Sequence, residues 1–208
     1  MREAREVKTV ENCAWSRANE KLSRYHDTEW GVPLHDDHLL FEHLMLEVMQ
    51  CGLNWNMMLQ KREIFHQCFD HFEFDRIAAY TEEDIARIMA VPGMIRSRRK
   101  IEAVIHNARC YQAIRRSFGS FDAYLWAFTD GHMLVYRGHP QGAMPPRNGL
   151  SDRISADLRK RGFKFVGPVT VYSFLQAIGL VNDHYETCPR FHEIMANHPV
   201  RYEEPDNE

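Results

Sequence analysis

The sequence has 208 residues, of which 44% are hydrophobic and 26% are charged, and its formal net charge is −3. This composition is that of an ordinary globular protein, and the chain is long enough to bury a core without a disulfide scaffold. No apolar run reaches the roughly 18 residues that a membrane-spanning helix needs, and the charged N-terminal residues do not form a signal peptide. These features exclude a membrane protein, a secreted miniprotein, a coiled coil and a disordered chain, so we expect a cytoplasmic protein.

The charge is unevenly distributed along the chain. Four acidic residues fall within 203–208, and the rest of the chain has a net charge of about +1 without them. Basic residues gather at 95–100, 114–116 and 158–165, although such runs are usually solvated helix faces. The chain has five cysteines and twelve histidines. An odd cysteine count argues against structural disulfides here and leaves metal ligation or simple burial open.

Polar residues that can begin helices precede most of the periodic apolar segments. The expected N-caps are Asp36 or Asp37, Asn54, Thr81 with Asp84 in a capping box, Ser97 and Ser151. The helices that they begin are expected over 39–51, 55–69, 82–90, 98–118 and 152–161. We expect Gly52 and Gly162 to follow the ends of the first and last of these helices.

The remaining segments predict shorter elements and one loop. Short helices are expected after Asp75 and over 121–128, and Pro168 suits the first turn of a helix over 169–179. The β-branched residues that begin this last segment leave a strand open as an alternative. The Gly/Pro-rich segment 138–149 indicates a long surface loop. Because persistent alternation is absent elsewhere, the sequence predicts an all-α fold of about eight to ten helices.

Two cysteines and two histidines lie near opposite ends of the chain. Cys13 and His26 are close to the N-terminus, whereas His184 and Cys188 lie one helical turn apart near the C-terminus. A Cys₂His₂ set has the ligands of a closed tetrahedral zinc site. Such a site would tie the two ends of the chain together. The spacing alone is also compatible with four unrelated core residues, and both interpretations stay open at this point.

Two helices joined by a short glycine-bounded turn are indicated over 151–180. In such a turn the backbone N–H groups of Val166 and Gly167 can face a phosphate at the N-terminus of the second helix. The basic residues at the same place are Lys160, Arg161 and Lys164. This is the arrangement of a helix-hairpin-helix DNA-binding element, and a purely structural turn is the alternative.

Four aromatic residues surround a glutamate in sequence order. The aromatic residues are Trp15, Tyr25, Trp30 and Trp55, and Glu47 lies between them on an apolar helix. A carboxylate beside an apolar stripe is costly unless it is paired or solvated. Aromatic walls with one carboxylate suit a flat cationic ligand such as an extruded purine. The alternative is a set of core aromatic residues and a surface glutamate.

Five ordered strings along the chain carry a family resemblance. They are CAW (13–15), RYHDTEWGVP (24–33), LFEHLMLEVMQCGLNW (40–55), KRE (61–63) and GFKFVGPVTVYSFLQAIGLVNDH (162–184). Together they resemble the 3-methyladenine DNA glycosylase I family, over residues 13–191. The resemblance implies a helix-hairpin-helix DNA repair enzyme that holds one zinc ion between its termini.

The resemblance also assigns roles to individual residues. It implies that zinc is held, with a structural role, by Cys13, His26, His184 and Cys188. It implies a base pocket formed by Trp15, Tyr25, Trp30, Glu47 and Trp55, with Glu47 as the catalytic residue that contacts the purine. The hairpin at 162–167 implies DNA contacts by Arg161, Gly162, Lys164, Val166 and Gly167. The family does not use the catalytic aspartate of other helix-hairpin-helix glycosylases, so Asp183 is only a weak candidate for chemistry.

The chain departs from the family pattern at four positions. The family often has a second pocket tyrosine where this chain has Leu22, and it commonly has threonine at the position of Met57. It usually has alanine at the position of Cys51 and serine at that of Asn54, which is an equally good N-cap. We expect Leu22 and Met57 to reshape the pocket, which affects the preferred base more than the reaction class.

The sequence thus predicts a monofunctional DNA N-glycosylase that extrudes N3-methyladenine from alkylated double-stranded DNA and releases it by hydrolysis. A zinc-stabilised DNA-binding protein with altered or lost excision activity is the alternative. A hydrolase with catalytic zinc is disfavoured, because four protein ligands leave no open position for water. We expect a monomer without a membrane partner. The expected organisation is an N-terminal extension over 1–12, a single glycosylase domain over 13–191 and an acidic tail over 192–208.

Overall fold

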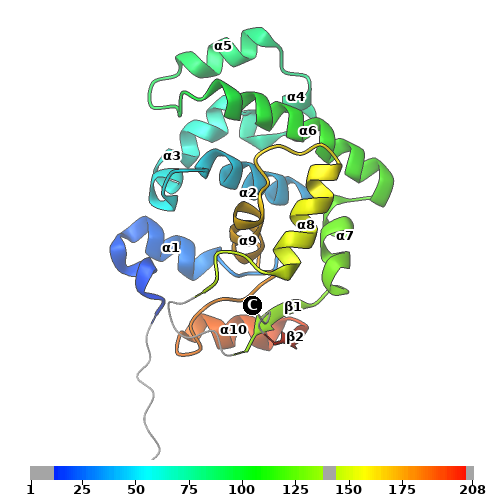
Figure 1. The fold of residues 1–208 in the computed structure, drawn as a ribbon. Coiled ribbons are helices and arrows are strands. Elements are labelled where there is room, and N and C mark those ends of the chain that lie inside the picture. Colours follow the sequence, from blue (N-terminus) through cyan, green and yellow to red (C-terminus); the bar gives the residue numbers. More distant parts are fainter. Residues whose placement is uncertain (1–11, 138–143, 205–208) are drawn as a thin grey trace, which may run out of the picture.

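The computed structural model describes residues 12–137 and 144–204, and Figure 1 shows that most of them are helical. The first half contains η1 (Ala14–Ala18), α1 (Glu20–Thr28), α2 (Asp37–Gln50), α3 (Trp55–Cys68), η2 (Asp70–Phe72), α4 (Phe74–Ala78) and α5 (Glu82–Ala90). The second half contains α6 (Arg98–Phe118), α7 (Phe121–Trp126), η3 (Ala127–Thr129), β1 (Met133–Tyr136), α8 (Gly149–Lys160), α9 (Pro168–Ala177), α10 (Pro189–Asn197) and β2 (Val200–Glu203).

Helix α2 lies at the centre of the molecule. Every residue from Leu40 to Met49 is buried, and the helix packs against α3, α6, α7 and α9. A helix that is covered all round is normally apolar. Three buried polar residues interrupt this one, and they are Glu42, His43 and Glu47. Glu42 is paired with the Arg62 guanidinium at 2.7 Å, so the helix interior tolerates that charge.

The helix boundaries follow the capping residues in most cases. Asp36 accepts from the Leu39 amide at 2.9 Å, Asn54 accepts from the Met57 amide at 2.8 Å, and Thr81 with Asp84 forms a capping box. Ser97 occupies the N-cap of α6 without a side-chain capping bond. The prediction that Ser151 is the N-cap of the helix expected over 152–161 is wrong. Asn148 is the N-cap of α8, and Ser151 lies at the third helical position, where it completes a capping box.

The segment after Pro168 is helical, which settles the alternative of a strand there in favour of α9. The expectation of an all-α fold is wrong in one respect, because β1 and β2 form a two-stranded parallel pair with Met133 opposite Val200. Four-residue strands are too short to show a periodicity, and their pairing joins segments far apart in sequence.

The C-terminal segment folds against the rest of the molecule. Residues 192–203, which the sequence analysis placed in an acidic tail, contribute most of α10 and all of β2. Figure 1 shows α10 and the strand pair together at the lower end of the molecule, below α1, α8 and α9. Residues 138–143 of the expected loop lie outside the described residues. None of the helices in the described part of the chain combines the length and the apolar character that crossing a membrane requires.

Candidate active site and metal centre

Helix α1 directs two neighbouring side chains to two different sites. The helix begins at Asn19, whose side chain accepts from the Leu22 amide at 3.0 Å. Tyr25 lines a cavity, whereas His26 belongs to a cluster of possible metal ligands. Both side chains are buried. Tyr25 belongs to a small apolar core that also contains Trp30, Cys13 and Cys188, and the His26 ring stacks on Trp30 of that core. The two sites therefore share a wall.

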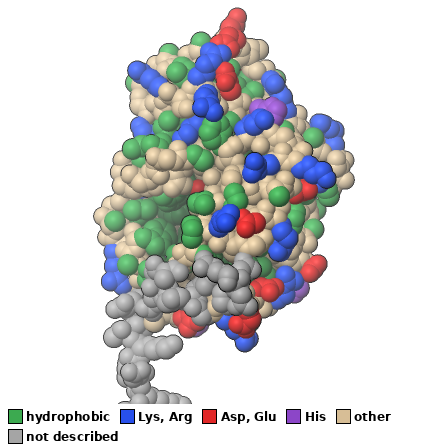
Figure 2. Space-filling view, in the orientation of Figure 1, with side chains coloured by type: hydrophobic (Ala, Val, Ile, Leu, Met, Phe, Trp, Pro, Cys, Tyr) green, Lys and Arg blue, Asp and Glu red, His purple; other side chains and the backbone are tan. Residues whose placement is uncertain are grey.

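The cavity has a volume of about 480 Å³, which is the size range of small-molecule sites. Figure 2 shows a hollow with hydrophobic side chains beside the region that α1 occupies. All five residues predicted for the base pocket line the cavity, namely Trp15, Tyr25, Trp30, Glu47 and Trp55. The aromatic rings contact one another, with 5.0 Å between the centroids of Trp15 and Trp30 and 5.2 Å between those of Tyr25 and Trp55.

Glu47 is the acidic residue of the cavity wall. It projects from the buried helix α2 and is only 4% exposed. No group in the described part of the chain donates a hydrogen bond to its carboxyl group. Burial therefore raises the pKa of Glu47 to about 8. Burial also raises the pKa of Tyr25 well above its ordinary value, and the nearby Glu47 charge adds to this effect.

A second wall residue has an unsatisfied polar atom. The indole Nε1 of Trp55 is buried without a hydrogen-bond partner among the described residues. Buried polar atoms normally find partners, and an exception at a cavity is typical of a group that meets a ligand. The cavity wall therefore contains one buried acceptor and one buried donor that the protein itself does not satisfy.

The sequence analysis missed several polar wall residues. These are Gln50, Asn54, Asn56, Ser173 and Gln176. Ser173 and Gln176 lie three residues apart on one face of α9, and this helical spacing was the available signal. Gln176 donates its amide to Asp183 at 2.7 Å, and the Tyr172 hydroxyl donates to the same carboxylate oxygen at 2.6 Å. Asp183 is thus held by the protein and does not belong to the cavity wall.

The family departures lie at different distances from the cavity. Leu22 and Asn54 line it, whereas Met57 and Cys51 are not among the wall residues. Met57, which was expected to reshape the pocket, therefore does not line it. Leu22 is 8% exposed and forms part of the wall, as expected.

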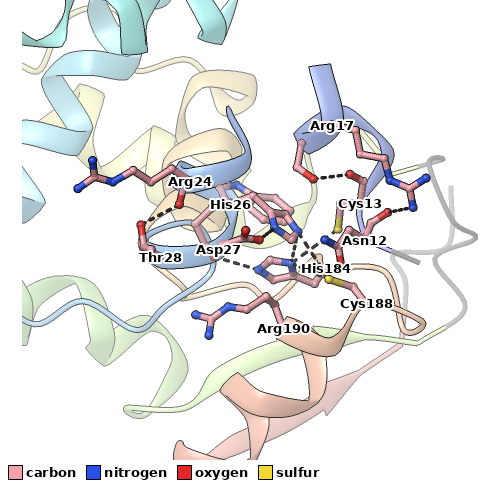
Figure 3. Close-up of polar contacts among 12 residues, drawn as sticks. Asn12, Cys13, Arg17, Arg24, His26, Asp27, Thr28, His184, Cys188 and Arg190 are labelled. Carbon is pink, nitrogen blue, oxygen red and sulfur yellow. Dashed lines mark hydrogen bonds and ion pairs between the residues drawn. The ribbon is translucent and has the colours of Figure 1, made fainter. Parts of the chain in front are cut away.

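Four buried residues form a cluster that could hold a metal ion. The atoms of Cys13, His26, His184 and Cys188 that can bind a metal all lie within 4.8 Å of one another. Figure 3 shows the four side chains converging from α1 and from segments near the two ends of the chain. His184 Nδ1 lies 3.1 Å from His26 Nε2, 3.6 Å from Cys13 Sγ and 3.8 Å from Cys188 Sγ. Cys188 Sγ lies 3.6 Å from His26 Nε2.

Neighbouring groups contact three of these four side chains. His26 Nδ1 lies 2.7 Å from an Asp27 carboxylate oxygen, and His184 Nε2 lies 3.0 Å from the Trp30 carbonyl oxygen. The Tyr185 amide donates to Cys13 Sγ at 3.4 Å. The two histidine contacts leave the inward-facing nitrogen of each ring free to bind a metal. Burial lowers the pKa of His184 to about 4, so the ring is neutral as ligation requires.

The connection between α8 and α9, residues 161–167, forms a turn that we call the hairpin. Gly162 has a φ of 97°, which suits glycine, and Phe165 has a φ of 56°. Phe163 and Val166 are buried beneath the turn, whereas Lys164 is exposed. Gly167 is the N-cap of α9, and Pro168 follows it. The predicted residues Gly162, Lys164, Val166 and Gly167 thus lie together in this turn.

Arg161 also belongs to the hairpin, but its side chain is engaged within the protein. Its Nε donates to Asp157 at 2.6 Å. Its guanidinium lies over the rings of Phe118 and Tyr124, at 4.8 and 5.1 Å from their centroids. These contacts hold the Arg161 side chain on α8, α6 and α7, whereas that of Lys164 is exposed.

Comparison with known proteins gives one consistent result. A family model described as methyladenine glycosylase matches residues 15–192. The chain is 42% identical over 179 residues to DNA-3-methyladenine glycosylase 1 of Escherichia coli, a match that covers 86% of this chain and 96% of the relative. It is 38% identical over 177 residues to DNA-3-methyladenine glycosylase of Haemophilus influenzae, with 85% and 96% covered.

Solved structures agree with these matches. A crystal structure of 3-methyladenine DNA glycosylase I has a TM-score of 0.82 and 43% identity, and the match covers 86% of this chain and 98% of that one. A structure that describes 3-methyladenine recognition by the Staphylococcus aureus enzyme has a TM-score of 0.82 and 36% identity, with 86% and 96% covered.

Proposed function

This chain belongs to the methyladenine glycosylase family, and on that premise we propose that it is a monofunctional DNA N-glycosylase that releases N3-methyladenine from alkylated double-stranded DNA. The observation that carries the proposal is the cavity with aromatic walls and the buried, unpartnered carboxyl group of Glu47. A flat methylated base with a positive charge matches both features, because aromatic faces attract cations and the carboxylate supplies the opposite charge.

The reaction begins with extrusion of the damaged nucleotide into the cavity. Extrusion costs less for a damaged base than for a normal one, which contributes to selection. N3-methyladenine carries a positive charge while it is attached to the sugar, so it is already a good leaving group. Water attacks C1′ as the bond to the base breaks. The base takes the bonding electron pair and leaves as neutral N3-methyladenine, and the attacking water loses one proton to the solvent.

Glu47 is the catalytic residue of this proposal. Its carboxylate accepts hydrogen bonds from the adenine edge and stabilises the positive charge that moves from the base to the sugar as the bond breaks. None of the described wall residues is a lysine, so the site offers no amine for a Schiff base. We therefore expect base release without strand cleavage.

The metal that we propose for the Cys13, His26, His184 and Cys188 cluster is a single structural zinc ion. Zinc bonds of about 2.0–2.3 Å to nitrogen and sulfur place the atoms of a tetrahedral site roughly 3.3–3.8 Å apart. Four of the six separations run from 3.1 to 3.8 Å, and all six lie within 4.8 Å, so the residues present fit the ion. Four protein ligands would close the site, and the ion would stabilise the fold by joining the two ends of the chain.

We propose that α8, the hairpin and α9 form a helix-hairpin-helix element that contacts the DNA backbone. The first-turn amides of α9 have no partners within the helix, as at any helix N-terminus, and they favour a phosphate. Lys164 adds an exposed positive charge. The engagement of Arg161 with Asp157 makes Lys164 the stronger candidate for a direct phosphate contact.

A base-release assay tests the proposed function. Wild-type protein is incubated with duplex DNA that carries N3-methyladenine, and the released base and the integrity of the strands are measured separately. We expect release of N3-methyladenine, an intact phosphodiester backbone until alkali is added, and a marked loss of release in Glu47→Gln. A wild-type protein that binds duplex DNA and releases no base would instead indicate a DNA-binding protein without excision activity.

A further inference from the structure

Two surface segments that would meet DNA are both attached to one helix. The first segment is residues 51–54, which we call the rim turn because it joins α2, the helix of Glu47, to α3, which begins at Trp55. The second is the hairpin. Three polar side chains of helix α6, those of Lys100, His106 and Asn107, contact the backbones of these two segments.

Lys100 attaches the rim turn to α6. Its ammonium group donates to the carbonyl oxygens of Met49 and Cys51, both at 2.7 Å, and the residue is only 9% exposed. These carbonyls lie at the C-terminal end of α2, where the helix leaves acceptors unsatisfied and favours a positive charge. Lys100 therefore fixes the end of α2 and the start of the rim turn.

Asn107 attaches the hairpin to the same face of α6, two helical turns further along. Its side-chain oxygen accepts from the Lys164 amide at 2.8 Å, and its amide donates to the Lys164 carbonyl at 3.1 Å. The adjacent His106 has its Nε2 2.9 Å from the Gly162 carbonyl oxygen. Asn107 is fully buried, and an amide that satisfies both backbone groups of one residue fixes that residue's position.

The two segments also contact each other. Cys51 Sγ lies 3.8 Å from the Phe165 carbonyl oxygen and 3.5 Å from the Thr170 hydroxyl. The rest of this face of α6 is apolar, and its buried residues include Ile101, Val104, Ala108 and Tyr111. Lys100 and Asn107 thus interrupt a core face, and each does so where the backbone of the rim turn or of the hairpin is held.

We infer that Lys100 and Asn107 are positioning residues for base excision, which hold the hairpin and the rim turn in one fixed relation so that DNA bound at the hairpin presents its extruded base to Glu47. The inference rests on the proposed function. Its physical basis is that small displacements of a bound reactive group lower rates strongly, because catalysis depends on a narrow geometry.

The test uses the full chain and five variants. Lys100→Met and Asn107→Leu each remove the polar contacts and keep a side chain of similar length, and the two are combined in a double variant. Lys100→Arg keeps donors for both carbonyls. Arg116→Met is the control, since it removes a positive charge from an exposed position in the last turn of α6. The measurements are single-turnover release at saturating protein, affinity for undamaged duplex, and hydrogen exchange of the rim-turn amides with and without duplex.

We expect Lys100→Met and Asn107→Leu each to lower single-turnover release by about 10- to 100-fold. The affinity of Lys100→Met for duplex stays within about twofold, because the phosphate contacts are unchanged. Lys100→Arg recovers most of the rate, and Arg116→Met behaves like wild type. The double variant is at most about threefold slower than the slower of the two single variants, because breaking either attachment already separates the two segments.

Hydrogen exchange gives a readout that does not depend on activity. Duplex bound at the hairpin protects the rim-turn amides in wild type, and this protection disappears in both single variants. Wild-type rates and protection in the folded variants would overturn the inference, as would losses that multiply in the double variant. A wild-type protein that releases no base overturns the proposed function instead, and the exchange experiment still decides the role of Lys100 and Asn107.

Discussion

The Cys₂His₂ cluster and the aromatic cavity adjoin the same small apolar core, but they differ in whether the protein satisfies their polar groups. In the cluster, the ring nitrogens of His26 and His184 that face outward contact Asp27 and the Trp30 carbonyl. In the cavity, Glu47 and the Trp55 indole nitrogen are buried without described partners. The same core therefore supports one site that is satisfied within the protein and one that a ligand must complete.

This difference separates stability from chemistry. A buried polar group with partners stabilises the fold, whereas an unpartnered one costs free energy and is retained where it meets a ligand. Changes at the cluster are thus expected to act mainly on folding. Changes at Glu47 are expected to act mainly on the reaction. The predictions below test this division, beginning with the largest effect.

Removing one cluster ligand should weaken folding and leave the cavity chemistry of the folded fraction intact. We expect Cys188→Ala to lose the bound metal and to lower the free energy of unfolding by about 4 kcal/mol or more. For a chain of this size, the Tm falls by roughly 8–16 °C. Metal content and thermal unfolding of the purified proteins measure the effect.

Cys110→Ala is the matched control, because Cys110 is half-buried and lies outside the cluster. It should retain about one equivalent of zinc and most of its stability. A Cys188→Ala protein that melts like wild type would contradict the structural role of the cluster. A wild-type protein that is fully stable without metal would contradict it as well.

Glu47→Gln should give the opposite result, with normal folding and slow excision. An amide of the same size replaces the charged acceptor, and the lost charge-assisted hydrogen bond is worth roughly 1.5–3 kcal/mol, or about 10- to 150-fold in rate. Duplex affinity should change little, because phosphate contacts dominate it. Release of N3-methyladenine and duplex binding are measured in parallel, with the exposed Glu63→Gln on α3 as control. An equal loss of rate and duplex affinity would contradict the assigned role.

The raised pKa of Glu47 predicts a pH dependence that is specific to the cavity. The ionised form of Glu47 is the active one, and half of the Glu47 carboxyl groups are ionised near pH 8 in the free protein. We therefore expect kcat/KM for base release to rise about fivefold between pH 7 and pH 8. The rise should be absent in Glu47→Gln. A flat profile in wild type would show that the carboxyl group is already ionised at neutral pH.

The same shift affects stability with a definite sign. The folded protein holds the Glu47 proton more tightly than the unfolded chain does. The contribution of this proton to the free energy of unfolding is therefore full below pH 4.5 and decreases as pH rises towards 8. Glu47→Gln should lack this decrease. Denaturant titrations of both proteins at pH 5 and pH 8.5 measure the difference.

The sequence was a good guide to local structure and to which residues lie together in the cavity and in the cluster. Side-chain caps such as Asn54 and the pair of Thr81 and Asp84 act through contacts three residues away, so they can be recognised locally. The five pocket residues and the four cluster residues were recognised through long strings that resemble one family, since their spacing alone was also compatible with ordinary core positions.

The missed features depend on contacts between distant segments. The parallel pairing of β1 with β2 joins residues more than sixty positions apart, and a four-residue strand has no periodicity of its own. The attachment of Lys100 to the end of α2 and the engagement of Arg161 by aromatic rings of α6 and α7 likewise depend on how helices pack. In sequence, Lys100 appeared only as a member of a basic cluster, and Arg161 appeared as a hairpin residue expected to contact DNA.

The smallest predicted effect separates DNA affinity from both sites. Lys164 is exposed in the hairpin, and its backbone, not its ammonium group, is held by Asn107. Lys164→Ala should therefore leave folding, metal content and the affinity for free N3-methyladenine unchanged, and it should weaken binding to all duplexes by about threefold at physiological salt. Loss of one phosphate contact lowers the slope of log affinity against log salt by about one. Binding of several unrelated duplexes over a range of salt concentrations measures this slope, with Arg161→Ala for comparison.

Arg161 is engaged by Asp157 and two aromatic rings, so its replacement should lower thermal stability more than it changes the slope. A loss of binding in Lys164→Ala that is restricted to one DNA sequence would indicate base reading by the hairpin and would contradict its assignment to the backbone.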